Sequence, residues 1–192
     1  MSRNRKLQAV MLAVSAVVVL AGTAAALAAR QEKASEKPAP AQAAKPGKAE
    51  MDRLKFYLGE WEYTENYPKG GTNTGIYTSK LGPGGNSLIN TFHSQGPMGD
   101  FEGLLILTWD PKESAYKAYA FGNEFPGALV ETGTFEGDAL VYRSELRLGG
   151  QTWKLRNVTH VISAEKLESD EYSAKGDGPE TLLVHVSATR KH

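Results

Sequence analysis

Glu131 is the acidic residue of this sequence with the most promising surroundings for chemistry. It lies in a run in which Leu129, Glu131, Gly133 and Phe135 occupy every second position and so share one face of a strand. A carboxylate among apolar neighbours is costly unless it is hydrogen-bonded, paired or protonated. We therefore expect Glu131 to anchor a ligand, or to act as a general base with a raised pKa. The alternatives are that Glu131 stands in water at the edge of the fold, or that the strand faces the other way.

Neutral polar residues form a second candidate group, on a predicted hairpin over residues 139–162. Four of them share one face of that hairpin: Tyr142, Ser144, Asn157 and Thr159. A ligand pocket needs a mostly apolar wall with a few polar groups, and Trp153, Leu146 and Leu155 would supply that wall. The candidate ligand-binding residues are therefore Glu131, Tyr142, Ser144, Trp153, Asn157 and Thr159. The alternative is a filled core in which internal waters satisfy the polar groups.

The turn at Gly149-Gly150 sets this arrangement. If the two glycines form a two-residue loop, one face pairs Leu146 with Trp153, Ser144 with Leu155, Tyr142 with Asn157 and Leu140 with Thr159. The other face pairs Glu145 with Lys154 and Arg143 with Arg156. The first face is mostly apolar and the second is charged, so we expect the first to be the interior. A two- or four-residue turn around Gly137 places Glu131 on this interior face, and a three-residue turn would place it outside.

Composition and motifs exclude several classes of site. The chain has no cysteine, which excludes disulfides, cysteine-ligated metals and a thiol nucleophile. His93, His160 and His185 fall on separate predicted strands without a neighbour at metal-ligand spacing, so we expect no metal and no haem. The sequence has no nucleophile elbow, no His-Glu-x-x-His and no phosphate-binding glycine loop before a helix, so we assign no cofactor and no catalytic residue. The 22 basic and 22 acidic residues balance, which gives no support for a nucleic-acid surface.

Residues 1–28 are typical of a signal peptide. Arg3, Arg5 and Lys6 precede the uncharged residues 7–29, and Ala26-Leu27-Ala28 has small residues at the spacing that a signal peptidase reads. We expect cleavage after Ala28. The alternative is an uncleaved anchor, since residues 7–29 are long enough to span a bilayer. Either way we expect export to the bacterial periplasm or beyond, with tethering to the inner membrane only through residues 7–29 if they stay uncleaved.

The rest of the chain divides into a linker and one domain. Residues 29–50 are rich in Pro, Ala and Lys and contain no aromatic residue and no Val, Ile, Leu or Phe, so we expect a disordered linker. All aromatic residues follow position 55, and residues 51–192 make one domain of common size.

Alternation of apolar and polar residues predicts an all-β domain. About ten strands are expected, near residues 59–67, 73–81, 86–94, 101–109, 115–122, 127–135, 139–148, 151–162, 168–175 and 181–190. In the last of these, Leu182, Val184 and Val186 are expected in the core. Helical spacing occurs only over residues 50–58. Short hairpins in series favour a single antiparallel up-and-down barrel, because closure removes exposed strand edges; an open sandwich is the alternative.

Several short motifs resemble known families. Leu58-Gly59-Glu60-Trp61 resembles the Gly-x-Trp signature of lipocalins and their calycin relatives. Together with Gly96-Pro97-Met98-Gly99, Leu107-Thr108-Trp109-Asp110-Pro111 and Phe135-Glu136-Gly137-Asp138, it looks like a bacterial family known as a domain of unknown function, number fifteen seventy-nine. The resemblance covers residues 50–191 and implies a calycin-like barrel, without an established activity.

The lipocalin resemblance also implies how the barrel closes. The signature tryptophan packs at the closed end and a basic residue of the last strand stacks over it. Here Gly59 and Trp61 match the signature, and Arg190 is the expected partner, with Lys191 as second choice.

The function that these observations favour is binding. We expect an exported lipocalin-like protein that holds a small, largely apolar molecule in the barrel without changing it. The alternatives are an envelope interaction module that acts through its outer surface, and an enzyme that uses the same cavity with Glu131 or a histidine as acid–base.

Overall fold

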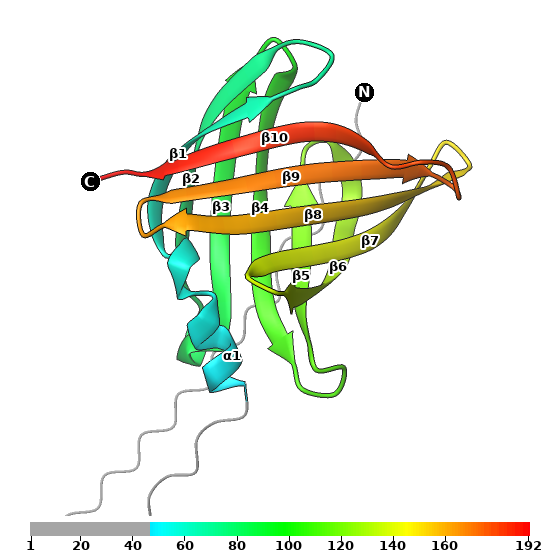
Figure 1. The fold of residues 1–192 in the computed structure, drawn as a ribbon. Helices are drawn as coiled ribbons and strands as arrows, with labels where there is room; N and C mark the ends of the chain where they lie inside the picture. The colour runs from blue at the N-terminus through cyan, green and yellow to red at the C-terminus, as the bar shows by residue number, and fades with distance from the viewer. Residues whose placement is uncertain (1–46) are drawn as a thin grey trace, which may run out of the picture. The chain divides into compact units, whose positions relative to one another are not determined.

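The computed structural model describes residues 47–192, apart from the side chains of Phe125 and Pro126. Ten antiparallel strands form one closed barrel in which each strand pairs with the next and β10 pairs with β1 (Figure 1). The strands are β1 (Gly59–Asn66), β2 (Thr72–Leu81), β3 (Ser87–Gly96), β4 (Gly99–Asp110), β5 (Ala115–Gly122), β6 (Phe125–Glu136), β7 (Ala139–Leu148), β8 (Gln151–Ser163), β9 (Lys166–Lys175) and β10 (Thr181–Arg190). This confirms the predicted all-β up-and-down barrel. The predicted signal peptide lies outside the described residues.

The register of the β7–β8 hairpin is the predicted one. Gly149 and Gly150 form its two-residue loop, both with positive φ. The pairs are Leu146–Trp153, Ser144–Leu155, Tyr142–Asn157 and Leu140–Thr159 on one face, and Glu145–Lys154 and Arg143–Arg156 on the other. Glu136 pairs with Ala139, so the turn at Gly137 has two residues and Glu131 faces the interior.

One expected core position is wrong. Leu182 is 37% exposed, whereas Val184 is 7% exposed. The pairing of β10 with β9 shifts between these two residues. The extra residue of this β-bulge reverses the alternation, so Leu182 points outward while Val184 keeps its place in the core.

A short helical segment closes one end of the barrel, the lower end in Figure 1. The sequence predicts a helix over residues 50–58, but the structure has α1 (Lys48–Arg53) followed by a 3₁₀ turn, η1 (Lys55–Tyr57). Residues 48–50, at the end of the predicted linker, are therefore helical. The tighter 3₁₀ turn brings Tyr57 and Leu58 against the core immediately before β1 begins. Within residues 47–192, no helix has both the length and the apolar character to cross a membrane.

The closed end is a continuous apolar cluster. Met51 and Leu54 of the helical segment insert among buried side chains of the strands: Leu88, Leu107, Tyr116, Ala118, Leu140 and Tyr142. Tyr116 donates its hydroxyl proton to the Glu50 carbonyl at 3.0 Å. Arg53 lies 3.7 Å from the centre of the Phe135 ring. Burial of these side chains is the main stabilising contribution of this end.

Arg190 ties the last strand to the segment that precedes the first, as the lipocalin resemblance implies. Its guanidinium lies 4.2 Å from the centre of the fully buried Trp61 ring. It donates hydrogen bonds to the carbonyls of Ala164 at 2.9 Å and Phe56 at 3.2 Å, and also to that of Leu58. Gly59 has φ 114°, and a Cβ there would lie 2.6 Å from Arg190 Nη1. The glycine of the signature is therefore required by both backbone conformation and the closeness of the guanidinium.

Three interior glycines lie beneath aromatic rings of neighbouring strands. Tyr142 of β7 covers Gly133 of β6, with which it pairs, so closely that a Cβ would not fit. The same arrangement joins Phe92 to Gly103 and Tyr63 to Gly75. Glycine lets a strand bend sharply, and the ring fills the space that its missing side chain leaves.

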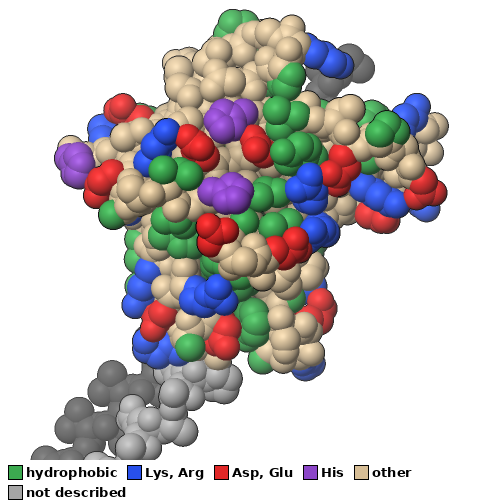
Figure 2. Space-filling model, in the orientation of Figure 1, with side chains coloured by type: hydrophobic (Ala, Val, Ile, Leu, Met, Phe, Trp, Pro, Cys, Tyr) green, Lys and Arg blue, Asp and Glu red, His purple; other side chains and the backbone are tan. Residues whose placement is uncertain are grey.

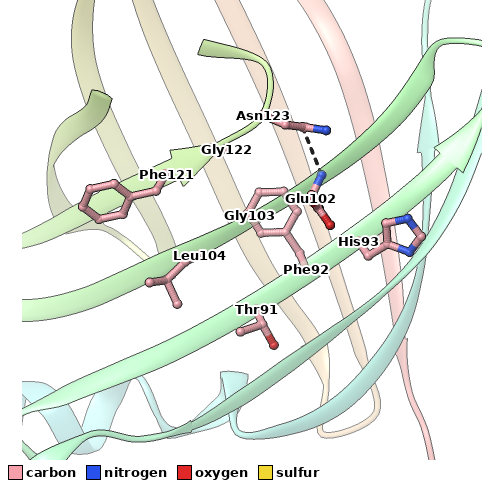
Figure 3. A pocket seen from close by; sticks show the side chains of 9 residues that line it. All are labelled: Thr91, Phe92, His93, Glu102, Gly103, Leu104, Phe121, Gly122 and Asn123. Atoms are coloured by element: carbon pink, nitrogen blue, oxygen red, sulfur yellow. Dashed lines mark hydrogen bonds between the residues drawn. The ribbon is translucent and has the colours of Figure 1, made fainter. Parts of the chain in front are cut away.

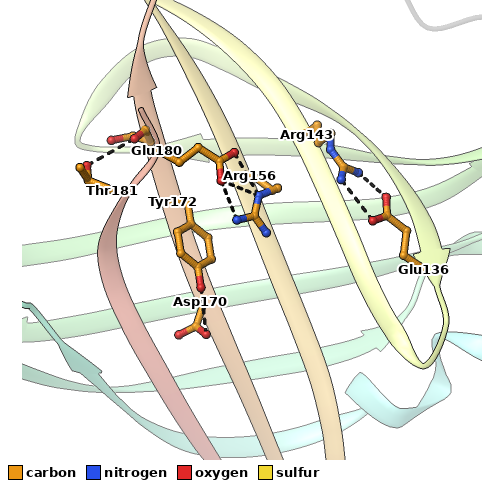
Figure 4. Close-up of polar contacts among 8 residues, drawn as sticks. Glu136, Arg143, Arg156, Asp170, Tyr172, Glu180 and Thr181 are labelled. Carbon is orange, nitrogen blue, oxygen red and sulfur yellow. Dashed lines mark hydrogen bonds and ion pairs between the residues drawn. The ribbon is translucent and has the colours of Figure 1, made fainter. Parts of the chain in front are cut away.

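The outer face carries mixed charges, with apolar side chains between them (Figure 2). Arg143 and Arg156 are cross-strand neighbours of like charge, and each has its own acidic partner (Figure 4). Arg156 Nη2 donates to Glu180 at 2.7 Å, and its guanidinium lies 4.1 Å from the Tyr172 ring centre. Arg143 donates from Nη1 and Nη2 to the two carboxylate oxygens of Glu136. These pairs offset the repulsion between the two arginines.

Arg190→Gln is expected to lower the free energy of unfolding by about 2 kcal/mol, because it removes the stacking on Trp61 and leaves the partly buried carbonyls of Phe56 and Leu58 without this donor. Urea unfolding followed by tryptophan fluorescence measures this. Lys191→Gln is the matched control, since Lys191 forms an exposed ion pair with Glu60 at 2.6 Å, and it should change stability little. Equal losses in the two variants would contradict the role given to Arg190.

Candidate functional site

The barrel interior is filled at the helix end and accessible towards the other end. Leu88, Leu107 and Leu140 face inward at the helix end and are at most 2% exposed. Farther from the helical segment, Glu171 of β9 pairs with Asn157 of β8 at an inward-facing position. Protein atoms surround its side chain, but the side chain is nevertheless exposed to solvent. A side chain inside a closed barrel can contact solvent only through unfilled space. The upper part of the barrel is therefore a lumen.

Small residues on β5 explain why this part is not filled. Ala118 lies opposite Glu131, Ala120 lies opposite Leu129, and Gly122 ends the strand. None of the three can reach the centre of the barrel. Leu129 and Leu155 also face the lumen and remain partly exposed, which leaves an apolar wall beside the polar groups.

Glu131 lies inside the barrel and accepts a hydrogen bond from a neutral side chain. Ser144 Oγ donates to its carboxylate at 3.3 Å. Burial raises the pKa of Glu131 to about 7; the negative charge of Glu171 adds to the rise, and the hydrogen bond from Ser144 opposes it. Glu131 is therefore a carboxyl group that exchanges its proton near neutral pH.

The other predicted residues all face the same interior. Asn157 donates to Glu171 at 3.4 Å, and Thr159 Oγ1 donates to Asn157 Oδ1 at 3.1 Å. Tyr142 is buried against the closed end, whereas Trp153 is partly exposed near the start of β8, away from the helical segment. The structure thus brings Glu131, Ser144, Asn157 and Thr159 to one region and places Trp153 nearer the open end.

Two carboxylates at inward-facing strand positions were not predicted from the sequence. Glu171 lies across from Asn157, and Glu65 lies on the inward alternation of Trp61 and Tyr63. Glu65 accepts hydrogen bonds from Ser94 and Tyr67, both at 3.0 Å. The alternation after Trp61 is the signal that would have found Glu65. A β-bulge between Val161 and Ser163 shifts the pairing of β8 with β9, so alternation counted from β8 does not predict that Glu171 faces inward.

Tyrosine hydroxyls gather between the filled end and the lumen. Burial raises the pKa of Tyr57 to about 12, and the nearby charge of Glu131 adds to the rise. Burial also raises the pKa of Tyr77 and of Tyr142, and the proximity of Tyr57 contributes to both. The hydroxyls of Tyr77 and Tyr142 are buried without a hydrogen-bond partner. These hydroxyls are neutral groups packed between the filled end and the lumen.

The predicted strand histidines lie on the outside. His93 Nε2 is 2.6 Å from Asp100 Oδ1, and His185 Nδ1 is 2.7 Å from Asp170 Oδ1. His160 is exposed on β8. Over residues 47–192 the structure contains no group of three His, Asp or Glu side chains placed to hold a metal ion.

A shallow depression of about 520 Å³ lies on the outer face of β3, β4 and β5 (Figure 3). Its lining includes Gly103 of β4 and the outward-facing side chains of Leu104 and Phe121. Its rim includes His93 and Asn123, whose side chain accepts a hydrogen bond from the Glu102 amide at 3.1 Å. The depression is separate from the lumen and brings no predicted binding residue together.

The raised pKa of Glu131 makes stability fall as pH rises. The folded protein holds a proton that the unfolded chain releases between about pH 4.5 and pH 7, so stability is lost across that interval, by about 3 kcal/mol. Glu131→Gln should therefore reduce the difference in unfolding free energy between pH 5 and pH 8 by about 2 kcal/mol. Urea unfolding at the two pH values measures it. Glu145→Gln, on the outer face of β7, is the control, and parallel behaviour of the two variants would contradict the assignment.

Solved structures similar to this chain are β-barrels of low sequence identity. A de novo designed fluorescence-activating β-barrel is 15% identical with a TM-score of 0.42, covering 73% of this chain and 98% of its own. The redesigned β-barrel mFAP0, bound to DFHBI, is 12% identical with a TM-score of 0.41, covering 70% and 99%. The S-type phycobiliprotein lyase CPES from Guillardia theta is 9% identical with a TM-score of 0.48, covering 77% and 98%. No curated protein matches the chain significantly.

The family comparison agrees with the motifs. The model of the family described as "Protein of unknown function (DUF1579)" matches residues 46–190, which include the whole barrel and α1. The resemblance seen in the Gly-x-Trp signature and in the turn motifs is thereby confirmed. This chain belongs to the DUF1579 family.

Proposed function

We propose that this protein is an exported carrier that binds a small, largely apolar molecule in the barrel lumen and releases it unchanged. The observation that carries the proposal is the accessibility of inward-facing side chains in a closed barrel, above all Glu171. Leu129, Leu146 and Leu155 offer apolar contacts, and Glu131 and Asn157 offer polar ones. A mostly apolar wall with a few polar groups is the usual composition of a small-molecule site.

Filling the lumen should weaken binding. Ala120→Phe adds a ring on the inward face of β5, and it is expected to weaken the binding of Nile red, a neutral apolar dye, at least about tenfold. Fluorescence titration of the full-length protein measures the affinity, and circular dichroism checks that the barrel is intact. Ala128→Phe adds the same ring on the outer face of β6 and should leave the affinity unchanged.

The outcomes separate the binding sites. Equal affinity in Ala120→Phe and the unaltered protein would reject the lumen as the site. Loss of binding in Ala128→Phe alone would place the dye on the outer face, where Tyr119, Phe121 and Val130 are exposed, and would support the interaction-module alternative. Absence of any Nile red binding would reject the proposed function.

Export is the second part of the proposal, and it is supported by the charged and then apolar order of residues 1–28. Native mass spectrometry of the protein purified from its own envelope fraction should show the mass of a chain that begins at Ala29. The same spectrum should show an additional mass that is lost on denaturation. The mass of the whole chain would instead indicate an uncleaved anchor, and recovery only from the cytoplasmic fraction would contradict export.

A further inference from the structure

The lumen is lined by carboxylates that lie close enough to influence one another. Glu65 comes from β1, Glu131 from β6 and Glu171 from β9. Glu124, in the turn between β5 and β6, folds back over Gly122. The surrounding protein atoms are the main cause of the raised pKa of Glu131 and of Glu171; the charge of Glu171 adds to the first rise, and the charges of Glu65 and Glu124 add to the second. Four acidic groups from separate parts of the chain therefore share one region of the barrel.

No cation of the described residues 47–192 pairs with these four carboxylates. Their side-chain hydrogen-bond donors are neutral: Ser94 and Tyr67 for Glu65, Ser144 for Glu131, and Asn157 for Glu171. The acids of the outer face differ, since Glu136, Asp177 and Glu180 each pair with an arginine or lysine. Lys175 is on the inward alternation of β9, but it is exposed at the rim and pairs with none of the four. The lumen thus has an excess of acidic groups that no basic side chain offsets.

A buried hydroxyl points into the same region and lacks a partner. Tyr142 is 4% exposed, and its hydroxyl oxygen has no hydrogen-bond partner. It projects inward from β7, as does Ser144, which donates to Glu131. Burial raises the pKa of Tyr142, and Tyr57 and the charge of Glu131 add to the rise. Buried polar groups normally form hydrogen bonds, so a buried hydroxyl without one beside the lumen indicates a missing partner.

We infer that the ligand carries a protonated nitrogen, an organic ammonium or amidinium group, held between Glu131 and Glu171 with the Tyr142 hydroxyl beneath it. The inference rests on the proposed function and names the chemistry of its ligand. A cation removes the mutual repulsion of the carboxylates, and an N–H group supplies a donor to the Tyr142 oxygen. The apolar remainder of the molecule packs against Leu129 and Leu155. An organic cation is favoured over a metal ion because the described residues hold no set of ligands placed for a metal.

Three fluorescent probes of different charge test the inference. Thioflavin T is a permanent cation without an N–H group and therefore tests the charge preference alone, Nile red is neutral, and 1-anilinonaphthalene-8-sulfonate is anionic. The full-length protein at pH 8 should bind thioflavin T at least about tenfold more tightly than the anionic probe. The double variant Glu131→Gln/Glu171→Gln should lower the ratio of thioflavin T to Nile red affinity about tenfold. Glu131→Asp, which keeps the charge, should preserve that ratio.

A control pair matches the charge change. Glu62→Gln/Glu145→Gln removes two carboxylates from the outer face, where both are exposed, and it should leave the ratio of affinities unchanged. If the control lowers the ratio as much as the lumen variant does, then net charge alone attracts the probe and the inference fails.

Lowering the pH should reduce the preference for thioflavin T, as the double variant Glu131→Gln/Glu171→Gln does. Lowering the pH from 8 to 5 protonates Glu131, so the affinity ratio should fall, again about tenfold. The groups facing Glu131 are Glu171, which also takes up a proton more readily because of its burial, and the tyrosines Tyr57 and Tyr142. The tyrosines stay neutral in this range, because burial raises their pKa. A ratio independent of pH would contradict the inference.

The two proposals fail in different ways. If Nile red binds in the lumen but thioflavin T binds no more tightly than the anionic probe, the charge inference is overturned and the carrier function stands. The same holds if the lumen variant keeps the full preference for thioflavin T. If no probe binds, the carrier function is rejected, and the inference falls with it.

Discussion

Pairing of the last strand with the first is the constraint on which the rest of this structure depends. Ten strands in series leave two open edges unless β10 meets β1, and Arg190 holds that junction. Its guanidinium stacks on Trp61 and donates to backbone carbonyls on both sides of the junction. Once the sheet is closed, each strand has an inside and an outside, and every second side chain is committed to the interior.

The two ends of the barrel use that interior differently. The helix end is packed with Leu54, Leu88, Leu107 and Leu140, and burial of these side chains stabilises the whole domain. The other end keeps carboxylates and hydroxyls inside the barrel, where repulsion and lost hydration oppose folding. Such a combination is expected where a site is built at the expense of stability. The pH dependence expected for Glu131 is a direct expression of this opposition.

Much of the fold could be predicted from local patterns. The glycines at 149 and 150 and the turn at Gly137 determine the register over β6, β7 and β8, which placed Glu131, Tyr142, Ser144 and Asn157 inside the barrel. The prediction was wrong for Leu182 and missed Glu171, and both lie beside β-bulges. A bulge adds one residue without changing the composition of the strand, so simple alternation does not reveal it. Whether the interior is filled could not be predicted either, since it depends on which small residues of β5 lie opposite the large ones.

The position of Arg190 also determines when this barrel can form during synthesis. The residue contacts the Leu58 carbonyl across 132 positions of sequence, so nearly the whole domain must leave the ribosome before the contact exists. Until then β1 and β9 each have an unpaired edge, which is a template for pairing with other chains. Contacts between residues so distant in sequence form slowly. The growing chain therefore depends on being kept apart from its neighbours until its final strand is complete.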